Sequence, residues 1–118
     1  MAFKSLLIFA VVLSILCMAA AGGLDGGWEP IKNPNDPTVV EIAKFAVAEN
    51  NKKYKAALVL VSVERGETRV AAGTQYQLVL SIKDSAAARW PPIKYLALVW
   101  DKPQEKLRKL IRFYQITN

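Results

Sequence analysis

Residues 36–51 read DPTVVEIAKFAVAENN, and this stretch decides the fold. Asp36 is a suitable helix N-cap, because its carboxylate can accept hydrogen bonds from the free amides of the first turn. Pro37 follows at the first helical position, where its missing N–H is no loss. Asn50 and Asn51 predict the end of the helix, since asparagine tolerates the left-handed conformation of a C-terminal cap.

The apolar residues of this stretch recur at helical spacing and cover one continuous arc. At about 100° per residue, the arc spans roughly 220° of the helix circumference, whereas an ordinary surface helix buries a stripe of about 100° or more. The helix must therefore be covered over most of its surface, and the residues that follow it favour strands. We predict an α+β fold in which one long helix is wrapped by a curved antiparallel sheet. The arc consists of Val39, Val40, Ile42, Ala43, Phe45, Ala46 and Val47, and the remainder of Glu41, Lys44 and Ala48.

Four later segments are predicted to be strands of that sheet. Residues 57–63 are a run of β-branched and aliphatic residues. Across residues 75–83 apolar and polar residues alternate, which predicts one buried face and one mostly solvent-exposed face. Residues 93–100 form another apolar strand. The leucines after Pro103 have helical spacing, but a short return favours a last strand that pairs back on 93–101.

The position of the first hairpin turn has two solutions in the sequence. Arg65-Gly66-Glu67 is either the turn itself or a bulge within a longer strand. Ala71-Ala72-Gly73 is the second candidate turn. A turn that contains Pro103 is expected over residues 101–104, and Trp28 to Ile31 form a short extended piece before the helix.

The first 21 residues have the features of a secretory signal peptide. Lys4 supplies the positive charge, residues 6–16 form an apolar run too short for a typical membrane span, and Ala19 to Ala21 gives the small-residue cleavage pattern. We expect cleavage after Ala21, one domain over residues 22–118, and a secreted protein, extracellular or vacuolar. A retained signal anchor is the alternative.

The composition excludes most catalytic chemistry. The sequence has no histidine, and its one cysteine, Cys17, lies in the predicted signal peptide. Most nucleophiles, general bases and zinc sites are therefore missing, and we expect no enzyme activity, no metal and no cofactor. Loss of Lys4 with the signal peptide leaves 15 of the 16 basic residues against 10 acidic ones. Both signs are interleaved along the chain, which argues against binding to nucleic acid or to membranes.

Several segments, in the same order, resemble the plant cystatins. Residues 42–47, IAKFAV, are similar to the helix signature of this family, usually written L-A-R-F-A-V. Gly26-Gly27-Trp28 resembles its N-terminal glycine motif. Residues 95–103, YLALVWDKP, resemble the strand that leads into its second binding hairpin. The resemblance covers essentially the whole mature chain.

The resemblance implies a reversible inhibitor of papain-like cysteine proteases, with one helix wrapped by a four- to five-stranded antiparallel sheet. The N-terminal glycine arm and two hairpins would form a wedge that enters the active-site cleft without a covalent step. It further implies that residues 69–73 are the first hairpin, so that Arg65-Gly66 is a bulge. The implied protease-binding residues are Gly26, Gly27, Arg69, Val70, Ala71, Ala72, Gly73, Pro103 and Gln104.

The chain departs from the family pattern in both hairpins. In the first, Q-x-V-x-G, the glutamine is replaced by Arg69 and the central valine by Ala71, and only Gly73 is kept. In the second, Gln104 stands where the family has tryptophan. Our hypothesis is an inhibitor that binds weakly or selectively. The alternative is a cystatin-fold protein that has lost inhibition and serves as a binding or structural protein.

These residues also have ordinary structural interpretations. Gly26-Gly27 suits a flexible terminus, Gly73 and Pro103 suit turns, and Trp100 suits a core position. Arg69 is either a solvated side chain or a new contact to an acidic protease surface. The functional interpretation therefore depends on the three segments occurring together. We expect a monomer, with a dimer that exchanges its helix and first strand as the alternative; the targets are either a plant's own proteases or, in a defensive role, those of pests.

Overall fold

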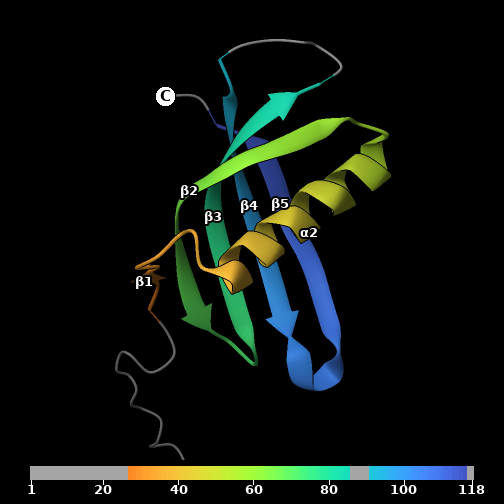
Figure 1. Ribbon diagram of the computed structural model, residues 1–118. Helices are drawn as coiled ribbons and strands as arrows, with labels where there is room; N and C mark the ends of the chain where they lie inside the picture. Colours follow the sequence, from red (N-terminus) through yellow and green to blue (C-terminus); the bar gives the residue numbers. More distant parts are fainter. Residues whose placement is uncertain (1–26, 86–90, 117–118) are drawn as a thin grey trace, which may run out of the picture.

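The structure, a computed structural model, describes residues 27–85 and 91–116. These residues form one long helix and an antiparallel sheet (Figure 1). The elements are β1 (Glu29–Pro30), α2 (Pro37–Tyr54), β2 (Leu58–Val70), β3 (Thr74–Asp84), β4 (Ile93–Lys102), the 3-10 helix η1 (Pro103–Glu105) and β5 (Leu107–Gln115). The sheet has five strands in the order β1-β2-β3-β4-β5, and each pair is antiparallel. The predicted α+β architecture is confirmed, including the last strand.

Two predictions fall outside the described residues. They are the signal peptide, residues 1–21, and the first glycine of the arm, Gly26. Within the part of the chain that the structure describes, no helix is both long enough and apolar enough to cross a membrane.

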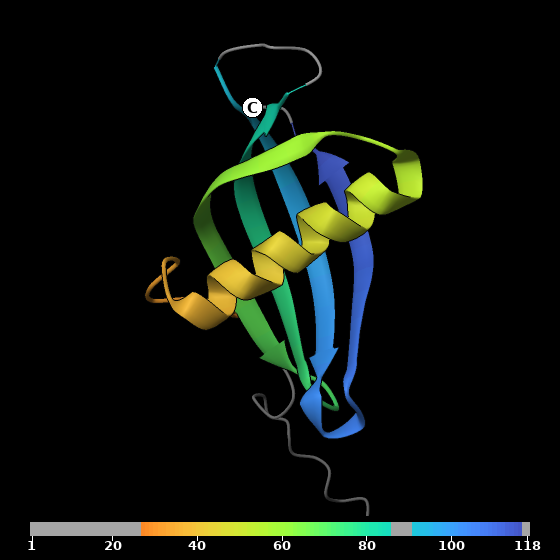
Figure 2. The ribbon, with the colours of Figure 1, turned by 45° about the vertical axis from the view of Figure 1, so that its right-hand side comes forward.

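Helix α2 lies obliquely across one face of the sheet (Figures 1 and 2). Asp36 caps it as predicted, because its carboxylate accepts a hydrogen bond from the amide of Thr38 at 2.9 Å. The predicted apolar arc faces the sheet, while Glu41, Lys44 and Ala48 are exposed. The buried residues of the helix are Val39, Ile42, Ala43, Ala46, Val47 and Asn50.

The predicted end of the helix was wrong. Instead of stopping at Asn50-Asn51, α2 continues to Tyr54 and is capped by Lys55 in the left-handed conformation, with φ of 54°. The Asn51 side chain has a different task, because its Nδ2 donates to the Leu58 carbonyl at 2.9 Å and its Oδ1 accepts from the Leu58 amide at 3.0 Å. The side chain of Asn51, which suggested a helix stop, therefore fixes the start of β2 against the last turns of α2.

The hydrophobic core fills the space between α2 and the inner face of the sheet. Burial of each large apolar side chain there contributes about 1.5–3 kcal/mol to stability. The largest fully buried side chains are Ile42, Leu78, Leu80, Ile82 and Val99.

Strand β2 is long and bent, and it curves over the sheet (Figure 2). Its pairing with β3 shifts register between Leu60 and Ser62 and again between Val63 and Arg65. The strand then continues through Gly66, where an added Cβ would lie 2.5 Å from Cδ2 of Leu78. The first candidate turn, Arg65-Gly66-Glu67, was therefore wrong, and the irregularity implied by the resemblance lies just before it.

The outer face of β3 is more buried than its alternating pattern predicted. Val79 and Ser81 were expected on a mostly exposed face, but they are 7% and 8% exposed. Strand β3 is the central strand, and Val79 lies between Arg65 of β2 and Leu96 of β4 in the ladder. Neighbouring side chains on both sides cover this face, which a single-strand pattern cannot reveal.

Candidate functional site

Both predicted hairpins lie at the same end of the sheet (Figures 1 and 2). The ladder requires this arrangement, because Thr74 at the start of β3 pairs with Asp101 near the end of β4. We call residues 27–28, 69–73 and 102–105 the hairpin end. It contains every predicted site residue that the structure describes. Gly26 lies outside the described residues, so its place in the site stays a prediction.

The first hairpin is a tight connection between β2 and β3. Val70 pairs with Thr74, and Ala72 and Gly73 both have positive φ, of 50° and 113°. A Cβ on Gly73 would lie 2.5 Å from the Asp101 carbonyl oxygen. Gly73 is therefore needed both for the turn and for the close approach to the second hairpin. At the tip, Val70 is 73% exposed.

Trp100 joins the two hairpins. Its Nε1 donates a hydrogen bond to the Ala71 carbonyl at 2.9 Å, and the Nζ of Lys102 lies 4.5 Å from the centre of its ring. Trp100 is half-buried, so it is neither the core residue that its strand position suggested nor a free surface group. Its role in the structure is to hold the first tip against the base of the second hairpin.

The second hairpin is built by η1. Strand β4 continues through Lys102, so the turn begins later than the predicted 101–104. Pro103 opens η1, and the amide of Lys106 donates to the Pro103 carbonyl at 3.0 Å. Pro103 and Gln104 are both exposed at this tip.

A group of charged side chains fixes the base of the second hairpin to the helix. Arg108 Nε donates to Oδ1 of the buried Asp101 at 2.9 Å, and Arg108 Nη1 lies 3.5 Å from Oε2 of Glu41 on α2. The hydrogen bond that Arg108 donates to Asp101 raises the pKa of Arg108 above its usual value. Burial, and then the charge of Asp101, raises the pKa of Tyr76. Sequence reasoning missed this support, because no local motif marks it.

The N-terminal arm reaches the hairpin end through Trp28. Strand β1 pairs with β2, with Glu29 opposite Thr68, and the Arg69 guanidinium carbon lies 4.6 Å from the centre of the Trp28 ring. Gly27 precedes it in open space, since a Cβ there would meet nothing within 4 Å. Trp28 was not among the predicted site residues; its position beside the Gly-Gly pair was the only signal.

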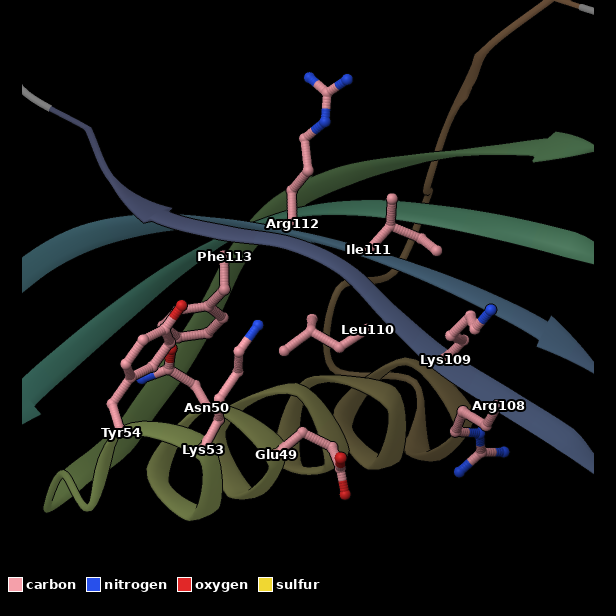
Figure 3. Close-up of a pocket in the computed structure, with 10 residues that line it drawn as sticks. All are labelled: Glu49, Asn50, Lys53, Tyr54, Arg108, Lys109, Leu110, Ile111, Arg112 and Phe113. Carbon is pink, nitrogen blue, oxygen red and sulfur yellow. The ribbon is translucent and has the colours of Figure 1, made fainter.

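A separate groove of about 280 Å³ lies between α2 and β5 (Figure 3). Phe113, Asn50 and Tyr54 come together at one end of this groove, whereas Arg112 points away from it. The lining mixes Lys53 and Lys109 with Glu49. Among the described residues, no group of acidic, His or Cys side chains could hold a metal ion. The groove includes none of the residues of the hairpin end.

Comparison with known proteins finds a matching family model and several similar sequences. The model of the family SQAPI, described as "Aspartic acid proteinase inhibitor", matches residues 31–116. The chain is 42% identical over 113 residues to "Cysteine proteinase inhibitor 5" of Arabidopsis thaliana, covering 96% of this chain and 90% of that protein. It is 45% identical over 91 residues to "Cysteine proteinase inhibitor 1" of Actinidia chinensis var. chinensis, covering 77% of this chain and 75% of the other.

Among solved structures, the salivary cystatin of the soft tick Ornithodoros moubata is similar in fold. The two superpose with a TM-score of 0.66 over 78% of this chain and 98% of the tick chain. Their sequences are 21% identical, so this likeness concerns the fold alone.

Proposed function

This chain belongs to the cystatin family of protease inhibitors, and we propose that it is a reversible, non-covalent inhibitor of papain-like cysteine proteases. The observation that carries the proposal is the joining of three segments at the hairpin end. Trp100 bonds to the Ala71 carbonyl, and Arg69 stacks on Trp28. The names of the relatives, cysteine proteinase inhibitors, support the same target class.

The shape of the hairpin end suits such a cleft. A papain-like protease holds an extended peptide over a nucleophilic thiolate. The first tip presents Val70, Ala71 and Ala72, which are small and apolar, on a rigid turn. It can fill the cleft on both sides of the thiolate without placing a peptide carbonyl in line for attack. Because the scaffold fixes the tips beforehand, binding costs less ordering of loops.

Two of the substituted residues, Ala71 and Gln104, are expected to weaken this binding. Gln104 is exposed at the second tip, where a tryptophan would supply a broad aromatic contact. Loss of an aromatic anchor typically costs about 2 kcal/mol, roughly a factor of 30 in affinity. Ala71 in place of valine removes two methyl groups, on the order of 1–1.5 kcal/mol if they were fully buried. We therefore propose an inhibitor that is weak or selective for a subset of papain-like proteases.

An inhibition assay with papain tests the proposal. The wild-type chain is expected to inhibit papain reversibly, and Gln104→Trp is expected to tighten inhibition about 30-fold. Gln115→Trp is the matched control, because Gln115 is exposed on β5 opposite Tyr95, away from the hairpin end. Failure of the wild type and of Gln104→Trp to inhibit any papain-like protease would contradict the proposal. It would favour a cystatin-fold protein that acts only by binding or as a structural component.

A second candidate is inhibition of aspartic proteases. It is favoured by the description of the matching family model, "Aspartic acid proteinase inhibitor", together with the altered hairpin residues Arg69 and Gln104. The same preparation should be assayed against pepsin. Inhibition of pepsin with no effect on papain would replace the first proposal by this one.

We further propose that the chain acts as a secreted monomer after removal of residues 1–21. The support is the charged, apolar and small-residue pattern of that segment. Mass spectrometry of the mature protein is expected to place the N-terminus near residue 22. Light scattering is expected to give the mass of one mature chain, and a mass twice as large would indicate the exchanged dimer.

A further inference from the structure

Arg69 makes its contacts inside the molecule. Its guanidinium carbon lies 4.6 Å from the centre of the Trp28 ring. Its Nη2 and Nε donate to the same oxygen, Oε1 of Gln75, at 2.8 and 3.3 Å. Within the described residues, none of the ion pairs includes Arg69. The arginine is therefore not freely solvated, which was one of the two interpretations that the sequence offered. The other interpretation, a contact with an acidic protease surface, stays a prediction.

The segment that precedes the helix is held by a short strand pairing and by Ile31, which packs against the core. Strand β1 has only two residues, and both are exposed. Beyond its pairing with β2, the amide of Ile31 donates to the Gly66 carbonyl at 2.9 Å. The stack of Arg69 on Trp28 lies closer to the glycine arm than either of these contacts. Among the contacts of the described residues it lies next to Gly27, where an added Cβ would meet nothing within 4 Å.

Gln75 holds the guanidinium in place from the other side. It pairs with Arg69 across β2 and β3 and with Trp100 across β3 and β4. A forked pair of donors to one amide oxygen restricts the plane of the guanidinium, and a fixed plane can stack on an aromatic face. The chain Trp28, Arg69, Gln75 therefore connects the arm to the rigid middle of the sheet.

We propose that Arg69 is a positioning residue that fixes the N-terminal arm to the first hairpin, so that the two meet a protease as one rigid unit. The inference rests on the proposed inhibition, because it gives a reason why an arginine stands where the family has glutamine. The shorter amide of glutamine lacks the planar cation that stacks on Trp28. Arg69→Gln should therefore weaken inhibition, although it introduces the residue usual in the family.

A double-mutant cycle tests the coupling through inhibition. Arg69→Gln and Trp28→Leu are each expected to weaken inhibition roughly fivefold to tenfold. The double variant is expected to be no weaker than either single one, because the contact is already lost. Arg65→Gln is the matched control, an exposed arginine on the same strand, and Trp28→Phe is expected to retain most of the inhibition. Additive losses, or tighter inhibition by Arg69→Gln, would overturn the proposal.

A second readout needs no protease. The heteronuclear NOE of the Gly27 and Trp28 amides in the free mature protein reports how firmly the arm is held. It is expected to fall in Arg69→Gln and to stay unchanged in Arg65→Gln. Unchanged values in Arg69→Gln would show that no tether exists, whatever the inhibition. A falling NOE in a chain that inhibits no protease would instead overturn the proposed function and the role in binding, while leaving the tether itself established.

Discussion

Gly73 is the residue of the hairpin end that tolerates substitution least. Its φ of 113° is unfavourable for any residue with a Cβ, and that atom would lie 2.5 Å from the Asp101 carbonyl oxygen. Gly73→Ala is expected to lower the free energy of unfolding by about 1–3 kcal/mol. Because it pushes the hairpins apart, it is also expected to weaken inhibition about tenfold or more. Urea denaturation and an inhibition constant measure the two effects.

Gly27→Ala is the control for this prediction. A Cβ on Gly27 would meet nothing within 4 Å, and the residue is exposed. Its substitution is expected to change the free energy of unfolding by less than about 0.5 kcal/mol. Equal stability of Gly73→Ala and Gly27→Ala would contradict the described contact between the hairpins.

A substitution of Trp100 tests the contact between the two hairpins. Trp100→Phe keeps a ring but removes the Nε1 donor to the half-buried Ala71 carbonyl. The expected loss is about 1 kcal/mol of unfolding free energy, with weaker inhibition, because the first tip is held less firmly. Tyr54→Phe also removes one polar group from a ring, at a position that is 65% exposed, and should be neutral. Thermal and urea unfolding of both variants give the comparison.

Among the elements, the junction of α2 and β2 depends on one side chain. Asn51→Ala removes both hydrogen bonds to the Leu58 backbone and leaves those groups without their partner. The expected cost is about 2 kcal/mol of unfolding free energy. Lys52→Ala, whose side chain is 76% exposed, is expected to cost about 0.5 kcal/mol or less. The denaturant midpoints of the two variants, compared at equal denaturant dependence of the unfolding free energy, measure this difference. Equal midpoints would show that the Asn51 hydrogen bonds do not stabilise the junction.

The elements differ in how far the sequence predicts them. The buried face of α2 follows from the spacing of its apolar residues, and the last strand follows from its short connection to β4. The end of α2 did not follow, because Asn51 bonds to Leu58, a tertiary contact that a local cap rule ignores. The dry outer face of β3 did not follow either, because burial of Val79 depends on strands that lie beside it.

Some features of the candidate site could be predicted from the sequence, and others could not. Gly73 and Pro103 were placed in turns by their chemistry, and the resemblance placed the hairpins in order. The role of Arg69 could not be predicted, because Trp28 is distant in the sequence and comes opposite it only after β1 pairs with β2. The same holds for Trp100, whose bond to Ala71 crosses between two hairpins.

For the whole molecule, two tyrosines predict sensitivity to alkali. Burial raises the pKa of Tyr76 and of Tyr95, and nearby Asp101 and Asp84 raise them further. Groups whose pKa is higher in the folded state contribute stability that is fully present below the unfolded pKa, about 10 for tyrosine. This contribution is lost as pH rises through the folded pKa. Unfolding free energy is therefore expected to fall above about pH 10.

Tyr95→Phe checks this sign. The variant should lose less unfolding free energy than the wild type between about pH 9 and pH 11. A steeper alkaline loss in Tyr95→Phe than in the wild type would contradict the assignment.

In the proposed function, the molecule acts as one rigid body whose N-terminal residues and hairpins meet the target together. The most direct measurement is the amide chemical-shift map of the labelled mature chain as an inactivated papain-like protease is added. We predict that the perturbed amides gather at residues 27–28, 69–73, 102, 104 and 105; Pro103 has no amide proton. The groove between α2 and β5 should stay unperturbed. Perturbations centred on that groove, or confined to one of the three segments, would contradict the account.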